Sequence, residues 1–266
     1  MWFQIKSYLN FLWNSKNQHG VHSPFVFQLV TQCFYDKKNY PQYHTLHSYR
    51  QALLCNKNTI IVSDFGAGSR VFNSNERAVN KIAKNAGISL KRAKLLFRIT
   101  QYFESDHILE IGTSLGLATS ALALGNPKAK ITSLEGCPNT IAIAQSQASK
   151  FHWDNIDFIN TKFEEYFNIE KSKSDSQNPQ PTTYNLIYFD GNHSKQATLD
   201  YFEYLLPSIT NESVWIFDDI HWSLDMEEAW KIIQQHPKVR VTIDTFQWGI
   251  IFFRSEQVKE HFTIRV

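Results

Sequence analysis

The chain has 266 residues, of which 42% are hydrophobic, enough to bury the core of one α/β domain with an added segment. Its 27 basic and 25 acidic residues give a formal net charge of +2 at pH 7. So small an excess creates no broad cationic field of the kind typical of nucleic-acid-binding proteins. We therefore expect one main domain with an N-terminal extension, and no nucleic-acid partner.

The cysteines and the apolar runs predict where the chain resides. Cys33, Cys55 and Cys137 are odd in number and lack paired short spacing, which disfavours a disulfide framework or a thiolate zinc site. The first residues lack the features of a signal peptide, and no apolar run approaches the about 20 residues that span a bilayer. We expect a soluble, cytoplasmic protein without stable membrane insertion.

The N-terminal segment is expected to be mainly helical. Apolar residues between Trp2 and Trp13 recur at helical spacing, which predicts an amphipathic helix. Packing against the protein is the favoured role of its apolar face, and a membrane or partner surface is the alternative. Ser23 followed by Pro24 is a typical helix start, with serine as N-cap and proline as first helical residue. We assign residues 1–88 to a helical cap or lid.

A glycine-rich stretch lies within this segment, where Asp64 is followed by GAGS ending at Ser69. Its glycines resemble those of a cofactor-binding turn, but the segment after it is polar. The acidic residue that would bind a ribose should end a second strand about 20 residues later, and no such strand follows. A lid or a loop on the substrate side is the favoured interpretation.

From Ser89 onward, predicted helices and strands alternate, which indicates a mostly parallel sheet. The last two strands are separated by so little chain that they must pair as a hairpin. We predict an α/β fold over residues 89–266, with a Rossmann-like, seven-stranded, mostly parallel sheet and an antiparallel C-terminal hairpin. The predicted strands are His107–Ile111, Lys130–Leu134, Ile156–Ile159, Tyr184–Phe189, Ser213–Phe217, and the segments 239–246 and 248–253; the segment 171–183 is a hydrophilic loop by composition.

The run from Ile108 to Leu124, ILEIGTSLGLATSALAL, reads as a buried strand, a glycine turn and a helix. Ligands in open α/β sheets bind beyond the carboxyl ends of the strands, so this turn predicts a nucleotide-type cofactor site. It lacks the third glycine of dinucleotide-binding turns, which favours a cofactor without a pyrophosphate. Glu135 ends the next strand, where a carboxylate can accept both hydroxyl hydrogens of a ribose.

Three further acids follow later strands: Asp190 after NLIYF, and Asp218 and Asp219 after SVWIF. Because the carboxyl ends of parallel strands share one edge, we expect these carboxylates to converge there. Gathered without a cation they would repel one another and raise each other's pKa, so their convergence favours a bound divalent ion. Oxygen ligands alone suit Mg²⁺, with Mn²⁺ or Ca²⁺ as alternatives.

Together, Glu110 with GTSLG, Glu135, FDGNHS and IFDDIHW resemble the class I S-adenosylmethionine-dependent methyltransferases, and more narrowly the metal-dependent small-molecule O-methyltransferases of the catechol, caffeoyl-coenzyme A and macrolide-sugar types. The resemblance covers roughly residues 89–254. It implies metal ligation by Asp190, Asp218 and Asp219, a catalytic role for Asp190, and cofactor binding by Glu110, Gly112, Thr113, Ser114, Gly116, Glu135, Gly136 and Asp190.

His193 is the candidate for taking the proton from the acceptor hydroxyl, because it occupies the place where catechol-type enzymes carry a lysine base. Macrolide-sugar enzymes use an acid two residues after the first ligand, where this chain has Asn192, so their base cannot be carried over. The alternative is that His193 caps the following helix. His221 ranks second as a residue lining the pocket.

The resulting hypothesis is methyl transfer from S-adenosylmethionine to a hydroxyl of a small molecule, with a divalent metal holding the acceptor oxyanion. Catechol-like and sugar hydroxyls both stay open. The alternatives are a non-catalytic S-adenosylmethionine-binding protein, a methyltransferase acting on a macromolecule, and a nicotinamide oxidoreductase. Relatives of this kind often dimerise, and a homodimer is compatible with the sequence.

Overall fold

The computed structural model describes residues 2–65, 68, 74–175 and 182–266. It divides into two compact units, one formed by Met1–Asp36 with Ser174–Val266 (unit 1) and the other by Lys37–Lys173 (unit 2). The predicted assignment of residues 1–88 to a cap follows a different boundary and stays a prediction. In the part of the chain that the structure describes, no helix combines the length and the apolar character that crossing a membrane requires.

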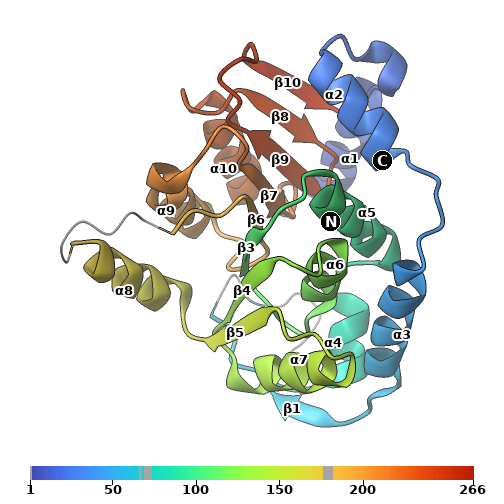
Figure 1. Ribbon diagram of the computed structural model, residues 1–266, viewed down its shortest axis with the longest axis vertical. Helices are drawn as coiled ribbons and strands as arrows, with labels where there is room; N and C mark the ends of the chain where they lie inside the picture. Colours follow the sequence, from blue (N-terminus) through green and yellow to red (C-terminus); the bar gives the residue numbers. More distant parts are fainter. Residues whose placement is uncertain (1, 66–67, 69–73, 176–181) are drawn as a thin grey trace. The chain divides into compact units, whose positions relative to one another are not determined.

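Unit 2 contains three parallel strands in the order β3-β4-β5 and a separate antiparallel pair, β1-β2. Figure 1 shows α3, α5, α6 and α7 on one side of the parallel strands and α8 on the other. The elements are α3 (Gln42–Cys55), β1 (Thr59–Ile61), β2 (Glu76–Ala78), α4 (Val79–Asn85), α5 (Leu90–Tyr102), β3 (His107–Ile111), α6 (Leu117–Gly125), β4 (Lys130–Glu135), α7 (Pro138–Lys150), β5 (Ile156–Asn160) and α8 (Phe163–Asp175), whose last two residues belong to unit 1.

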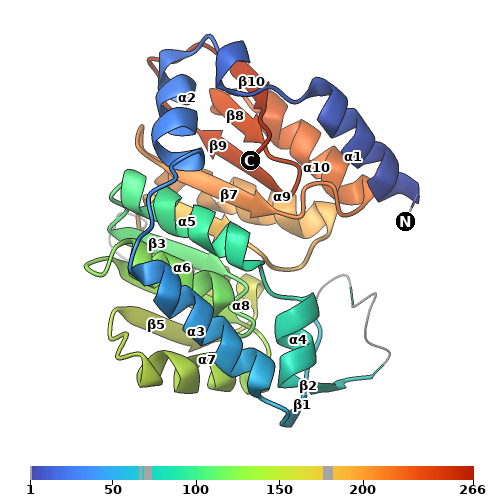
Figure 2. The same ribbon diagram turned by 90° about the vertical axis from the view of Figure 1, so that its right-hand side faces the viewer.

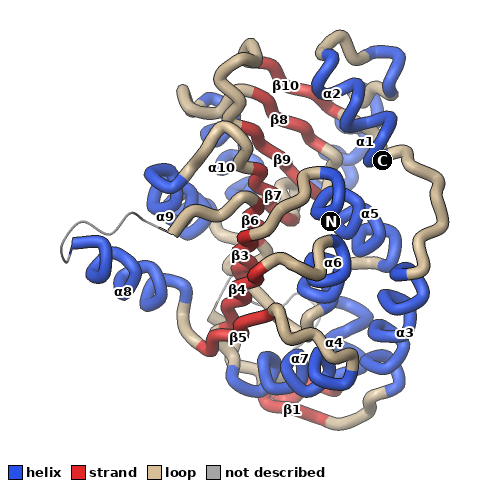
Figure 3. Tube along the Cα trace, in the orientation of Figure 1, coloured by secondary structure: helices blue, strands red, loops and turns tan. Residues whose placement is uncertain are grey.

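The described residues of unit 1 include five strands in the order β10-β8-β9-β7-β6. β6 and β7 are parallel, β9 runs antiparallel to both β7 and β8, and β10 is parallel to β8 (Figure 3). The elements are α1 (Trp2–Asn14), η1 (Gln18–Gly20), α2 (Pro24–Leu29), η2 (Val30–Phe34), β6 (Leu186–Phe189), α9 (Lys195–Leu205), η3 (Leu206–Ser208), β7 (Val214–Asp218), α10 (Leu224–Gln235), β8 (Val241–Asp244), β9 (Trp248–Phe252) and β10 (Glu260–Thr263).

Local signals in the sequence set several of these boundaries. The hydroxyl of Ser23 accepts a hydrogen bond from the backbone N–H of Val26, and α2 begins at Pro24, as predicted. Ser89 caps α5 in the same way through the N–H of Arg92. β6 and β7 are buried on both faces, which is why they read as continuous apolar runs rather than as alternating ones.

The predicted α/β fold with a mostly parallel, Rossmann-like sheet and a C-terminal hairpin is confirmed. β3 to β9 correspond to the seven predicted strands. β8 and β9 lie side by side (Figure 2) and form the predicted hairpin, in which Val241 is paired with Phe252. The structure adds β10, which the sequence analysis missed. The predicted loop over 171–183 is wrong in its first part, because α8 continues to Asp175, while residues 176–181 lie outside the described residues.

Candidate functional site

The turn between β3 and α6 brings unusual backbone conformations together. Gly112, Ser114 and Gly116 have φ angles of 104°, 49° and 76°. A side chain at Gly116 would also have no room, because an ideal Cβ there would lie 2.5 Å from the hydroxyl of Tyr49. That hydroxyl donates a 2.9 Å hydrogen bond to the carbonyl of Leu115, so the tyrosine holds the turn in place.

Glu135, at the end of β4, faces this turn. Its Oε2 accepts a 2.7 Å hydrogen bond from the backbone N–H of Ser114, and its Oε1 accepts one of 2.9 Å from the N–H of Cys137. Burial raises the pKa of Glu135, and these backbone donors oppose the rise. A carboxylate oxygen has two lone pairs, so each oxygen that holds the backbone can also accept a ligand hydroxyl. Thr113, in the same turn, shares a 2.6 Å hydrogen bond with Ser133.

Glu110 occupies the interior beneath the turn, with no exposed surface. Its Oε2 accepts 2.5 Å hydrogen bonds from the hydroxyls of Thr119 and Ser133, whereas its buried Oε1 has no hydrogen-bond partner. Burial raises the pKa of Glu110 to about 7 against these bonds. The residue thus braces β3, β4 and α6 from within, and its predicted direct contact with the cofactor stays a prediction.

The stretch leading from β1 into the glycine-rich loop supplies a feature that sequence reasoning missed. An ideal Cβ at Gly136 would lie 2.8 Å from the ring of Phe65, which is 52% exposed, and the ammonium of Lys162 lies 5.5 Å from the centre of that ring. Asp64 is paired with Arg77 at 3.4 Å. An aromatic ring therefore covers the residue after Glu135. In the rest of the predicted glycine-rich loop, residues 66, 67 and 69 lie outside the described residues.

The second group of predicted residues lies at the carboxyl ends of β6 and β7 in unit 1. Phe189 is paired in register with Phe217, so Asp190 and Asp218 leave the two strands at the same level. Asp218 accepts a 3.0 Å hydrogen bond from the backbone N–H of Asp219. Burial raises the pKa of Asp190, and the charges of Asp218 and Asp219 raise it further.

Backbone strain marks the same two strand ends. Asn192 and Asp219 have φ angles of 55° and 54°, in the left-handed region that residues other than glycine rarely adopt. Such conformations cost of order 1 kcal/mol or more and concentrate at functional sites, where the surrounding structure holds them. The sequence contains no glycine at either position to signal these turns.

His193 is paired with Asp190, with 3.5 Å between Nε2 and Oδ1. Burial raises the pKa of Asp190, and the charge of Asp218 raises it further, while His193 opposes the rise. For His193, burial lowers the pKa, but the hydrogen bond and charge of Asp190, with the charges of Asp219 and Asp218, outweigh burial and raise the pKa to about 9. In this arrangement His193 is a cation at neutral pH. The N-cap of α9 is Ser194, which accepts from the N–H of Ala197.

Within the described ranges, no three His, Cys, Asp or Glu side chains are arranged as a group that could hold a metal ion. Asp190, Asp218 and Asp219 supply only oxygen donors, which suits a hard divalent cation in its chemistry. Their placement at two adjacent strand ends brings the donors into one region without forming a closed coordination shell.

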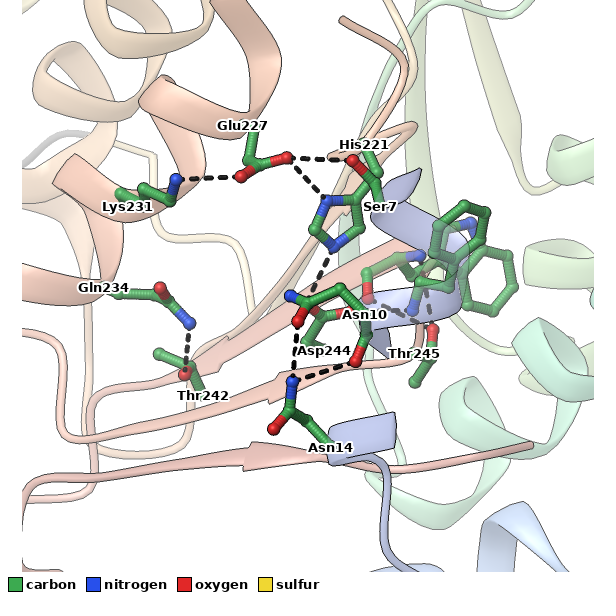
Figure 4. Close-up of polar contacts among 12 residues, drawn as sticks. Ser7, Asn10, Asn14, His221, Glu227, Lys231, Gln234, Thr242, Asp244 and Thr245 are labelled. Carbon is green, nitrogen blue, oxygen red and sulfur yellow. Dashed lines mark hydrogen bonds and ion pairs between the residues drawn. The ribbon is translucent and has the colours of Figure 1, made fainter. Parts of the chain in front are cut away.

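His221 lies between two carboxylates, as Figure 4 shows. Its Nε2 lies 2.8 Å from Asp244 and its Nδ1 lies 3.5 Å from Glu227, which also accepts a 3.2 Å hydrogen bond from the hydroxyl of Ser7 on α1. Burial lowers the pKa of His221, but the hydrogen bond and charge of Asp244, with Glu227, raise it above its usual value. The histidine ranked second from the sequence therefore joins α1, α10 and β8.

Residues 109–220 match the model of a family described as a methyltransferase domain. No curated protein matches the sequence. Among solved structures, a Podospora anserina methyltransferase bound to S-adenosylhomocysteine shares 14% identity and a TM-score of 0.58, covering 88% of this chain and 97% of that one. An O-methyltransferase from Bacillus cereus, also in complex with S-adenosylhomocysteine, shares 18% identity and a TM-score of 0.53, covering 85% and 96%.

An O-methyltransferase of Streptomyces achromogenes, involved in tomaymycin synthesis and in complex with S-adenosylmethionine, shares 12% identity and a TM-score of 0.56 over 84% of this chain and 94% of that one. At these identities the structural likeness establishes the fold alone. Residues 109–220, less than half of the chain, are similar to a methyltransferase domain, and the resemblance to class I S-adenosylmethionine-dependent methyltransferases is confirmed.

Proposed function

We propose that the protein transfers a methyl group from S-adenosylmethionine to a hydroxyl of a small molecule. The observation that carries the proposal is the cluster of Asp190, His193, Asp218 and Asp219 at two adjacent strand ends, because it offers both a proton acceptor and oxygen ligands to an acceptor hydroxyl. The O-methyltransferases among the similar structures agree with this chemistry.

Binding of the cofactor is assigned to unit 2. Gly112 lets the backbone approach a ligand closely, Gly116 lets the turn pack against Tyr49, and Glu135 accepts the two ribose hydroxyls while Ser114 and Cys137 fix its carboxylate. Support comes from the orientation of Glu135, whose two oxygens are held by separate backbone donors. This hydrogen bonding preorganises the carboxylate, so little rotamer freedom is lost when a ribose binds.

Acceptor activation is assigned to unit 1. In its neutral form, His193 donates its Nε2–H towards Asp190 and takes the proton of the acceptor hydroxyl at Nδ1, and Asp190 stabilises the imidazolium that forms. A raised pKa of about 9 makes the imidazole a strong base, but one that is present in its neutral form only to about 1% at pH 7. Holding the acceptor oxygen in line with the methyl group removes the entropic cost of their encounter.

The proposal includes a divalent cation, with Mg²⁺ preferred, to which Asp190, Asp218 and Asp219 would supply oxygen ligands, although their side chains do not already form a metal-holding group among the described residues. Support comes from the all-oxygen donor set and from the repulsion that raises the pKa of Asp190. When bound, such a cation supplies Lewis acidity that stabilises an acceptor oxyanion. A cytoplasmic location is also proposed, supported by three free cysteines, Cys33, Cys55 and Cys137.

Calorimetric titration with S-adenosylhomocysteine tests the proposal without knowledge of the acceptor. We expect saturable binding to the full chain, and a separate Mg²⁺ heat that Asp190→Asn combined with Asp218→Asn abolishes. Methyl transfer from labelled S-adenosylmethionine to a panel of phenols, sugars and amines then tests the class of acceptor. Absence of cofactor binding in the folded protein would refute the proposed function, whereas transfer to amines only would refute its hydroxyl specificity.

A further inference from the structure

The ring of Phe65 packs on the residue that follows Glu135. An ideal Cβ at Gly136 would lie 2.8 Å from Cδ2 and 3.1 Å from Cε2 of that ring. Because Gly136 has no side chain, the ring can contact the backbone directly. Phe65 is nevertheless 52% exposed, so about half of its surface is open to another molecule. An aromatic side chain is thus exposed beside the carboxylate to which ribose binding is assigned.

The backbone leading to Phe65 is held by the residue that also orients Glu135. The backbone N–H of Ser63 donates a 3.3 Å hydrogen bond to Sγ of Cys137. The N–H of the same cysteine donates the 2.9 Å hydrogen bond to Oε1 of Glu135. Cys137 therefore fixes the segment that carries the ring and the carboxylate together.

Two further contacts attach this segment to its neighbours. The side-chain amide of Asn139 on α7 donates a 2.7 Å hydrogen bond to the carbonyl of Ile61. The carboxylate of Asp64 lies 3.4 Å from the guanidinium of Arg77 on β2. The backbone next to Phe65 is thus tied to α7 on one side and to β2 on the other.

Lys162 contacts the same ring from the residues that follow β5. Its ammonium lies 5.5 Å from the centre of the Phe65 ring and 3.7 Å from the carboxylate of Glu165. A cation over an aromatic ring is attracted to it, so this contact favours the observed position of the ring. β4 and β5 are neighbouring parallel strands, so the ring lies at the edge formed by their carboxyl ends, where ligands of open α/β sheets bind.

We propose that Phe65 forms the stacking surface for the adenine base of S-adenosylmethionine. The base is bonded to the ribose, so a ribose held by Glu135 brings the base within reach of the neighbouring ring. Aromatic side chains stack on nucleobases through their π faces. The inference rests on the proposed function and extends the cofactor site to a residue outside the range 109–220 that matches the family model.

Calorimetric titration of the full chain with S-adenosylhomocysteine tests this assignment. Phe65→Ala should weaken binding about tenfold, a difference of about 1.4 kcal/mol, because the stacking surface is lost. Phe65→Tyr keeps an aromatic ring and should bind within about twofold of the wild-type protein. The matched control is Ile61→Ala, because Ile61 is a 64% exposed apolar side chain of the same segment and its contact with Asn139 uses the backbone carbonyl. This control should leave the affinity unchanged.

Two comparisons separate stacking on the base from an effect through Glu135. Phe65→Ala should weaken binding by the same factor in the Glu135→Gln background as in the wild-type protein, because the two side chains contact different parts of the ligand. A phenylalanine that only positioned the carboxylate would matter little once that carboxylate is removed. Adenosine, measured by competition with S-adenosylhomocysteine, should lose the same factor on Phe65→Ala, because it contains the base but not the homocysteine part.

Unchanged or tighter binding by Phe65→Ala would overturn the inference. A loss that disappears in the Glu135→Gln background, or one that adenosine does not share, would overturn it as well. The proposed function fails separately, when the folded wild-type protein does not bind S-adenosylhomocysteine at all. Wild-type binding that Phe65→Ala leaves unchanged would refute only the role of Phe65.

Discussion

Gly116→Ala tests how the turn between β3 and α6 is held. The new Cβ would lie 2.5 Å from the Tyr49 hydroxyl and 3.3 Å from Cβ of Ala144, at a φ angle of +76°. The left-handed conformation costs about 1 kcal/mol for alanine, and forcing a methyl group into a packed interior costs typically about 1–3 kcal/mol. We therefore expect the free energy of unfolding to fall by about 2–4 kcal/mol.

Gly68→Ala is the matched control, because Gly68 has a φ angle of +78° but an ideal Cβ there meets no atom within 4 Å. It should cost only the conformational part, about 1 kcal/mol or less. Urea unfolding followed by tryptophan fluorescence suits the measurement, since Trp153 stacks on Tyr49 at 5.3 Å. Tyr49→Phe removes the hydroxyl, so Gly116→Ala should cost about 1 kcal/mol less in that background.

Equal losses for the two glycine variants, or the same loss for Gly116→Ala with and without the Tyr49 hydroxyl, would refute the packing argument. The turn should also bind cofactor less well when it shifts, because the Ser114 N–H that holds Glu135 belongs to it. Calorimetry with S-adenosylhomocysteine on the still-folded Gly116→Ala protein should therefore show weaker binding than Gly68→Ala.

Three further predictions concern the acids and His193. Folding raises the pKa of Glu110 from 4.5 to about 7, so the wild-type protein should lose up to about 3 kcal/mol of unfolding free energy between pH 5 and pH 8 as this carboxyl group deprotonates. Glu110→Gln cannot ionise and should remove that loss. An unchanged pH dependence of the variant in urea titrations would contradict this. Glu135→Gln should weaken S-adenosylhomocysteine binding about tenfold. Asp218→Asn should leave that binding within twofold of the wild-type value but lower the rate of methyl transfer. Equal losses of cofactor affinity in the two variants would show that it is wrong to assign cofactor binding to Glu135 and acceptor activation to Asp218. His193 should titrate by NMR with a midpoint near pH 9, and saturating Mg²⁺ should lower that midpoint, because a cation beside Asp190 disfavours the imidazolium; a midpoint that Mg²⁺ leaves unchanged would argue against a cation there.

The fold was predictable from local signals. Strands that are buried on both faces, such as β6 and β7, appear in the sequence as short apolar runs, and each run ends in the acid that the structure places at the strand end. β10 was not predictable in this way, because Glu260–Thr263 is mostly polar and only Phe262 is buried. Its identity as a strand comes from pairing with β8, which is a contact between distant parts of the chain.

The same distinction applies to the candidate site. The candidate site residues at the strand ends could be identified from the sequence, but the residues that pack against them and hold them in place could not. Tyr49 against Gly116 and Phe65 against Gly136 are contacts that no spacing rule encodes. The hydrogen bond from Ser7 to Glu227 joins residues separated by 220 positions, and through it α1 is coupled to His221. Such supports decide the geometry of a site, while the residue types decide its chemistry.

From the sequence alone, Asp190, Asp218 and Asp219 are expected to form an isolated group of negative charges, but the structure places a histidine beside them. Asp190 already has a cationic partner, because His193 is protonated near neutral pH. A proton on His193 and a divalent ion at the acids therefore offer two ways to compensate the same buried carboxylate. Because each disfavours the other electrostatically, cation affinity should increase as pH rises toward 9, and proton release should accompany binding. The pH dependence of Mg²⁺ affinity is thus the property that joins the acid cluster to the histidine.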